Sequence, residues 1–311
     1  MIKNENSLNN INNSTSEEKE AFDLKRKGES ILNPGWCLDT LCSSRNSRYN
    51  KSCNLFQKSA DKYKSCFQWR KAAECYEKCA EIKLNLKESP IKYYQESITC
   101  YQNANSEINA KRVLFKLNDY LEKNGELLEA GKNCENVAIK FEKEKKYKDA
   151  IFYYIEAIKY YEKDIKKDNQ IINLKKKLIE LIIIINGYPN EEKYLIDYNE
   201  EIGINSLKNN LSENSAHYYF GKAILSVIYY KGIDEAELYI NKYKTIDQKF
   251  ESSNIYKLCF DIINDFKINN INKLYNDINK YKSNNECDAF MVNILKKIEN
   301  KIKIWNNHYI N

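Results

Sequence analysis

An aromatic-and-alanine signature recurs along the chain at a nearly fixed interval. Tyr76, Phe115 and Tyr153 each lie in a helix-forming stretch, and they are 39 and 38 residues apart. A second pair, Phe56 and Tyr94, is offset from this series and is also separated by 38 residues. A repeat of this length holds two helices, and stacked helical hairpins form solenoids of the tetratricopeptide kind. Because such solenoids present long surfaces to other macromolecules, the repeat favours a binding protein over an enzyme.

The composition also favours an all-α chain. Only 3 Pro and 8 Gly occur in 311 residues, whereas a strand protein needs many turn residues. The formal net charge of +6 is mild for this length. It predicts a weakly basic face and not the dense basic stripe of a dedicated nucleic-acid binder. We therefore expect no nucleic-acid partner.

The residues that carry chemistry are scarce or scattered. The ten cysteines form no CxxC pair and the only histidines are His217 and His308, so we expect no metal site. No glycine-rich phosphate loop is present, and two histidines give little scope for Cys–His catalysis. We expect no cofactor, no small-molecule substrate and no enzymatic activity. Cysteines beside alanines and aromatics act as small apolar residues, which predicts reduced thiols and a cytosolic protein.

The order of apolar and breaker residues predicts three parts. Residues 1–15 are polar and lack the apolar core of a signal peptide, so they are expected to form a disordered tail. Residues 16–206 should form a curved domain of helical hairpins, and residues 207–311 a closing helical bundle with a tail. Within the repeats a short helix is expected from Glu191 to Glu201, ending at Gly203. The aliphatic run at residues 178–185 is too short to span a bilayer, so any membrane contact should be peripheral.

Several stretches of the chain follow one another in an order that matches a known family. They are Tyr63-Lys64, Phe67 to Ala73, Asp149-Ala150-Ile151 with Ala157 and Tyr160-Tyr161, Gly203 to Leu207, Ser215 to Ala223, and Phe250 with Tyr256-Lys257-Leu258. In this order they resemble alpha-type soluble NSF attachment proteins, and the resemblance covers most of residues 17–304, apart from a short insertion around residues 165–170. It implies a curved solenoid capped by a bundle, acting as an adaptor that wraps an assembled SNARE complex and recruits the ATPase NSF to disassemble it.

The resemblance places SNARE-binding lysines at two positions. Lys132 matches a family lysine on the concave face, and the run Lys175, Lys176 and Lys177 supplies the second position, with Lys177 as the best match. Clustered lysines on a rigid face orient a partner and speed its capture more than they raise affinity. The alternative, which the residues alone leave open, is that these lysines belong to an ordinary solvated helix face.

A loop after the first predicted helix is the candidate membrane contact. Trp36, Leu38 and Leu41 lie in a segment with neither helical nor strand periodicity, followed by a polar and basic stretch. An amphipathic ring such as indole is favoured at the lipid interface, and the family places its hydrophobic loop here. In the alternative interpretation Trp36 folds back as a cap on the first hairpin.

The C-terminal part departs from the family pattern. Family members end in an acidic run and a penultimate leucine that stimulates the ATPase, whereas here Ile310 is penultimate and the acidic run is missing. Asp261 and Asp265 stand where the family carries an acidic patch that docks on the ATPase. Other readings are a gamma-type family member, a repeat scaffold that binds RNA, and an unrelated repeat protein that clamps peptides.

Overall fold

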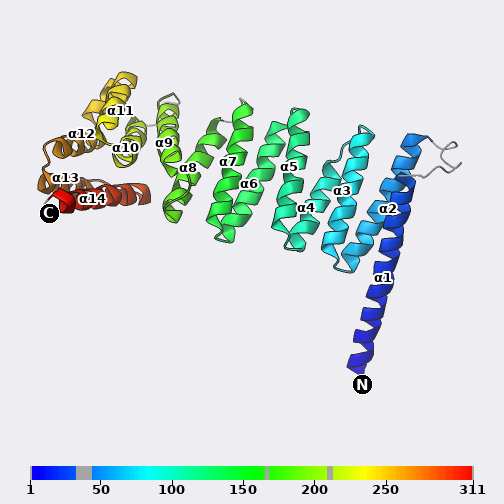
Figure 1. Ribbon diagram of the computed structural model, residues 1–311. Helices are drawn as coiled ribbons and strands as arrows, with labels where there is room; N and C mark the ends of the chain where they lie inside the picture. Colours follow the sequence, from blue (N-terminus) through cyan, green and yellow to red (C-terminus); the bar gives the residue numbers. More distant parts are fainter. Residues whose placement is uncertain (1, 33–43, 165–167, 209–212, 310–311) are drawn as a thin grey trace. The chain divides into compact units, whose positions relative to one another are not determined.

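The computed structural model describes residues 2–32, 44–164, 168–208 and 213–309. Those residues form fourteen α-helices and one 3-10 helix, with no strand among them, so the all-α prediction is confirmed (Figure 1). The helices are α1 (Ile2–Leu32), α2 (Arg45–Ser65), α3 (Trp69–Asn85), α4 (Ile91–Asn103), α5 (Glu107–Lys123), α6 (Leu127–Lys143), α7 (Tyr147–Lys163), α8 (Asp168–Ile185), α9 (Glu191–Lys208), α10 (Glu213–Tyr230), α11 (Ile233–Ile246), α12 (Asn254–Lys267), α13 (Ile271–Asn284) and α14 (Ala289–Tyr309), with η2 (Gln248–Ser252) between α11 and α12.

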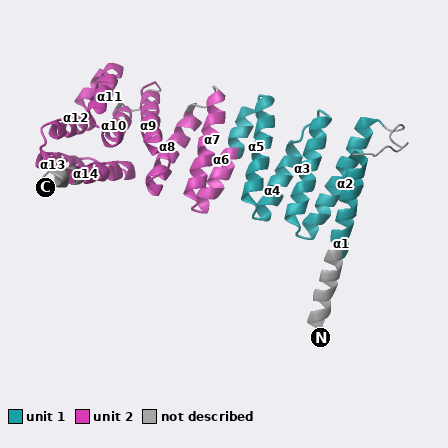
Figure 2. Ribbon diagram, in the orientation of Figure 1, with its two compact units in different colours: residues 1–133 teal, residues 134–311 magenta. Residues whose placement is uncertain are grey.

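The chain divides into two compact units, residues 1–133 and 134–311 (Figure 2). The helix α1 begins at Ile2. Side chains are described from residue 16 onward, and the disorder of the first 15 residues stays a prediction. The change of architecture expected near Ser206 also stays a prediction.

Unit 1 consists of consecutive antiparallel helices, each packed on the next from α1 to α5. Phe56, Tyr76 and Tyr94, three of the repeat anchors, are buried in its core. On α5 the buried side chain is Leu114, while Phe115 is half-buried. The aromatic spacing therefore detects the hairpin repeat, although on α5 the anchor is one residue away from the buried position.

The turns of unit 1 share one helix-ending motif. After α2, the amide of Phe67 donates to the carbonyl of Lys64 (3.0 Å) and the amide of Gln68 to that of Tyr63 (2.8 Å). This is the Schellman arrangement, in which the first residue past the cap adopts a left-handed conformation. The same two bonds recur after α3, α4 and α5, and the left-handed residues are Phe67 (φ 58°), Lys87 (φ 58°), Asn105 (φ 52°) and Gly125 (φ 76°).

Unit 2 continues with hairpins and then closes into a bundle around α10. That helix packs against α9, α11, α12 and α14, and α14 also returns to pack against α8. Its core holds an aromatic cluster in which Phe220 stacks on Tyr243 (ring centroids 4.4 Å apart) and meets Phe250 edge-on. The predicted solenoid of hairpins followed by a C-terminal bundle is confirmed at this level.

The expected end of the ninth helix at Gly203 is wrong, because α9 runs through this residue to Lys208. A Cβ atom at Gly203 would lie 2.6 Å from the Cε1 atom of Phe220, so the glycine lets α9 approach this ring. Glycine in the sequence was read as a helix stop, and the structure uses it for close helix packing.

The described cysteines are all free thiols, and six of the eight are buried. Within the described residues no group of three or more Cys, His, Asp or Glu side chains is arranged to hold a metal ion. None of the described helices combines the length and apolar character that a membrane crossing requires.

Candidate functional site

The predicted lysines occupy very different environments. Lys132 lies on α6 with an exposed side chain, and its ammonium is 3.8 Å from Glu129, one helical turn earlier. Such a pair between two exposed side chains contributes little to stability. Lys132 is therefore accessible to a partner, and its contact with a SNARE complex stays a prediction.

Lys175 is buried, with only 3 % of its surface exposed. Its ammonium bridges Glu162 on α7 (2.7 Å) and Glu201 on α9, and it lies 5.0 Å from the ring centre of Tyr198. Burial alone would lower the pKa of this ammonium, but the hydrogen bonds to the two carboxylates outweigh it and raise the pKa. Lys175 joins α7, α8 and α9, so we remove it from the predicted SNARE-binding set.

The other two lysines of this run point away from Lys175, because successive helical residues are about 100° apart. Lys177 is half-buried and pairs with Glu142 on α6 at 2.9 Å. Lys176 lies over the ring of Tyr219 at 5.5 Å and lines a hollow of about 340 Å³ among α8, α10 and α14. The three lysines therefore form no common patch, and only Lys176 and Lys177 remain available.

The floor of this hollow holds a lysine that the sequence analysis did not select. Lys222 on α10 is 4 % exposed and pairs with Asp288, and the rings of Tyr218 (4.5 Å), Tyr219 (5.0 Å) and Phe290 (5.2 Å) surround its ammonium. Burial lowers the pKa of Lys222, and the carboxylate of Asp288 offsets only part of this effect. In the sequence, Lys222 lies in the segment Ser215 to Ala223, which contributes to the family resemblance but does not by itself indicate a buried lysine.

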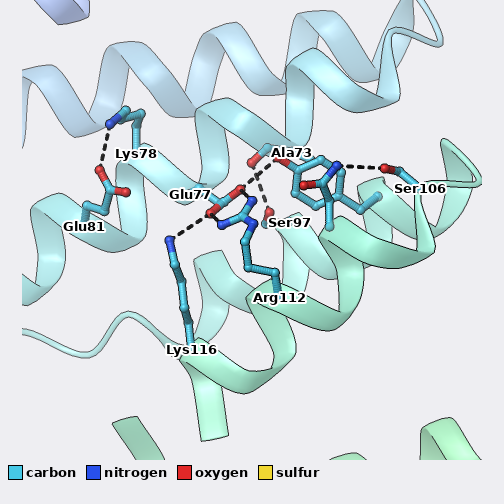
Figure 3. Close-up of polar contacts among 10 residues, drawn as sticks. Ala73, Glu77, Lys78, Glu81, Ser97, Ser106, Arg112 and Lys116 are labelled. Carbon is cyan, nitrogen blue, oxygen red and sulfur yellow. Dashed lines mark hydrogen bonds and ion pairs between the residues drawn. The ribbon is translucent and has the colours of Figure 1, made fainter. Parts of the chain in front are cut away.

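Unit 1 contains a buried ion cluster in which two cations surround the carboxylate of Glu77 on α3 (Figure 3). Arg112 on α5 donates two hydrogen bonds to the two carboxylate oxygens at 2.7 and 2.6 Å, and Lys116 adds a third at 3.2 Å. Tyr101 on α4 donates its hydroxyl at 2.8 Å. The two cations and the single carboxylate leave this cluster with one net positive charge.

Glu77 is 8 % exposed, and burial alone would raise the pKa of its carboxyl. The hydrogen bonds from Arg112, Tyr101 and Lys116 outweigh burial and lower that pKa. The cluster thus ties α3, α4 and α5 together. From the sequence, Glu77 is one of many acids on a charged helix, and nothing in its neighbourhood predicts a partner 35 residues away.

The two aspartates predicted to touch the ATPase also differ. Asp265 is 1 % exposed and pairs with Lys273 on α13 at 2.6 Å. Burial raises the pKa of Asp265 despite the opposing effect of Lys273. Asp261 is half-buried and lines a polar hollow of about 390 Å³ between α12 and α13, together with Lys257 and Asp277. We therefore keep Asp261 as a candidate contact and remove Asp265.

The remaining candidates lie outside the described residues. These are the loop residues Trp36, Leu38 and Leu41 and the penultimate Ile310.

A protein-family model matches most of the chain. The family model described as "Soluble NSF attachment protein, SNAP" matches residues 19–303. This chain belongs to the soluble NSF attachment protein family. The SNAP match extends from α1 to α14 and includes all the described candidate residues above.

Two curated SNAP relatives are similar at low identity. Alpha-soluble NSF attachment protein of Dictyostelium discoideum is 25% identical over 195 residues, which are 63% of this chain and 65% of that protein, slightly less than two thirds of its length. Vesicular-fusion protein SEC17 of Komagataella phaffii is 24% identical over 257 residues, or 82% of this chain and 78% of that protein. Among solved structures, the crystal structure of BtubC (BKLC) from P. vanneervenii is 15% identical and covers 76% of this chain and 93% of that chain, with a TM-score of 0.31 that supports no structural conclusion.

Proposed function

We propose that this protein is a non-enzymatic adaptor that binds assembled SNARE complexes and recruits the ATPase NSF for their disassembly in vesicle fusion and intracellular transport. The observation that carries the proposal is the family match over residues 19–303. The names of the two relatives, an NSF attachment protein and a vesicular-fusion protein, point the same way. Helical hairpins supply the extended surface that such an adaptor needs.

The proposed SNARE contacts are Lys132 in unit 1 and Lys177 in unit 2, and Lys176 is a further candidate in unit 2. Lys132 is exposed and only loosely held by Glu129, and Lys177 keeps nearly half of its side chain exposed beside Glu142. Both ammonium groups can exchange these partners for acidic residues of a SNARE bundle. Charge complementarity of this kind orients the complex and increases the rate of encounter.

The proposed ATPase contacts are Asp261 and Ile310, and the proposed membrane contact is the loop with Trp36, Leu38 and Leu41. The protein would then act in the cytoplasm, peripheral to the membrane.

The test replaces Lys132 and Lys177 together with Glu and measures binding of the full chain to an assembled SNARE complex. We expect the affinity to fall at least about tenfold, because two attractive charge pairs become repulsive. The matched control replaces Lys78 and Lys159 with Glu, since both are exposed and pair with a glutamate three residues away, as Lys132 does. Equal binding by wild type and the Lys132/Lys177 variant, with unchanged helicity, would rule out these contacts.

A further inference from the structure

One hairpin turn carries a residue unlike those at the equivalent turns. Phe67 occupies the left-handed position after α2, where the next three turns of unit 1 use Lys87, Asn105 and Gly125. Left-handed backbone favours Gly and Asn and costs energy at a bulky residue. A backbone preference therefore does not account for a phenylalanine here.

The Phe67 side chain is not used for packing either. It is 77 % exposed, and its ring contacts the half-buried Trp69 edge-on at 6.0 Å between centroids. Ile108, 85 % exposed, follows the turn after α4, and because α2 and α4 run in the same direction both turns lie at one end of unit 1 (Figure 1). We refer to Phe67, Trp69 and Ile108 as the apolar tip.

Three cations lie close in sequence to Phe67 and Trp69, whereas Ile108 follows Glu107. Residues 64–71 contain Lys64, Arg70 and Lys71 and no Asp or Glu. Glu96 and Glu18 pair with the two lysines at 2.9 and 2.5 Å, whereas exposed Arg70 forms no ion pair within the described part of the chain. Glu17 on α1 also lies at this turn, where its carboxylate accepts hydrogen bonds from Ser65 (3.0 Å) and Cys66 (3.6 Å). The turn thus combines a projecting aromatic ring with one exposed cation, Arg70, that is in no ion pair with the described residues.

The size of the tip distinguishes between classes of partner. An aromatic side chain presents about 150–250 Å², so two aromatics and one isoleucine, one of them half-buried, expose roughly 400 Å². A stable protein interface needs about 800 Å² per partner. A few projecting rings with adjacent cations are instead sufficient for interfacial membrane binding.

We propose that the apolar tip binds the surface of an anionic lipid bilayer. Phe67 and Ile108 enter the interfacial layer, Trp69 lies at the level of the headgroups, and Arg70 contacts a lipid phosphate or carboxylate. The site is distinct from the loop at residues 33–43, which follows α1 and precedes α2. That loop and the tip lie at opposite ends of α2, whose 21 residues extend about 30 Å. One flat bilayer contacts both only when α2 lies along its surface.

The experiment compares the full chain with the Phe67→Asn variant in flotation with phosphatidylcholine vesicles, with and without phosphatidylserine. Asn is what the chain itself uses at the equivalent Asn105 position, so the substitution suits the left-handed backbone. We expect vesicle partitioning to fall roughly tenfold, as loss of one buried aromatic side chain predicts. We also expect the melting temperature to stay the same or rise.

The matched control is Lys87→Asn, at the equivalent left-handed position in the next interhelical turn, and it should bind vesicles like wild type. Two results would overturn the proposal. One is that Phe67→Asn binds vesicles as well as wild type, and the other is that phosphatidylserine does not increase vesicle binding by wild type. A melting temperature several degrees lower would show that Phe67 packs the fold. Weaker SNARE or NSF binding with unaltered vesicle binding would assign the tip to a protein partner.

Discussion

At the residue scale, identical side chains in one sequence run serve different purposes. Lys175 is buried between two glutamates, whereas Lys177 remains half-exposed, although only one residue separates them. A basic run in the sequence cannot distinguish these roles, because the difference depends on Glu162 and Glu201 in neighbouring helices. Sequence reasoning located the segment correctly and could not sort its members.

Glu77 provides a test of the buried ion cluster. Glu77→Gln leaves Arg112 and Lys116 without their carboxylate, and both are about 40% exposed, so water compensates part of the loss. We expect the free energy of unfolding to drop by about 1–3 kcal/mol in urea denaturation at neutral pH. Glu81→Gln is the control, because its pair with Lys78 is exposed on both sides and should contribute under about 0.5 kcal/mol (Figure 3).

The same pair of variants carries a pH signature. The pKa of Glu77 is lower in the folded chain than in the unfolded one, so its stabilising contribution is complete above the unfolded pKa of about 4.3. That contribution disappears as the pH falls through the folded pKa. We therefore expect the stability gap between wild type and Glu77→Gln to narrow below about pH 4. A gap that is constant with pH, or no larger than that of Glu81→Gln, would contradict the assignment.

At the element scale, small residues decide where helices meet. α10 contacts four other helices, and Gly221 on it faces Ile255 of α12. Caps and breakers are local signals, so the sequence locates helix ends where no tertiary contact competes with them. Which glycine ends a helix and which admits a neighbouring helix depends on tertiary packing, so Gly203 was misread.

Gly221→Ala tests this close approach. A Cβ atom there would lie 1.9 Å from Cγ1 of Ile255, which requires the two helices or the side chain to move. Helix propensity alone favours Ala over Gly by about 1 kcal/mol, so without this contact the variant would be more stable than wild type. Overpacking costs about 1–3 kcal/mol, and at this separation we expect the variant to unfold at lower urea concentration. In an Ile255→Ala background, which lacks Cγ1, Gly221→Ala should destabilise the chain much less, and this coupling would confirm the contact. A more stable Gly221→Ala single variant would exclude it.

At the scale of the whole molecule, the repeat spacing was sufficient to predict the fold. Aromatic residues 38–39 apart identified the hairpins, since a unit of this length holds two helices and each unit repeats the same packing positions. The candidate site was less predictable. Lys222 and the Glu77 cluster depend on residues from helices that are distant in sequence. The sequence suggests that Asp265 lies on the surface, whereas packing of the helices buries it.

The central claim is that this chain acts as an adaptor for NSF on SNARE complexes. The most direct measurement is the rate at which NSF from the same cell, supplied with ATP, disassembles a preformed fluorescent SNARE complex. The rate is compared with and without the purified 311-residue chain. We predict ATP-dependent disassembly only when the chain is present, with a reduced rate for the Ile310→Ala variant. If a second SNAP from that cell supports disassembly under the same conditions and this chain does not, the account is contradicted.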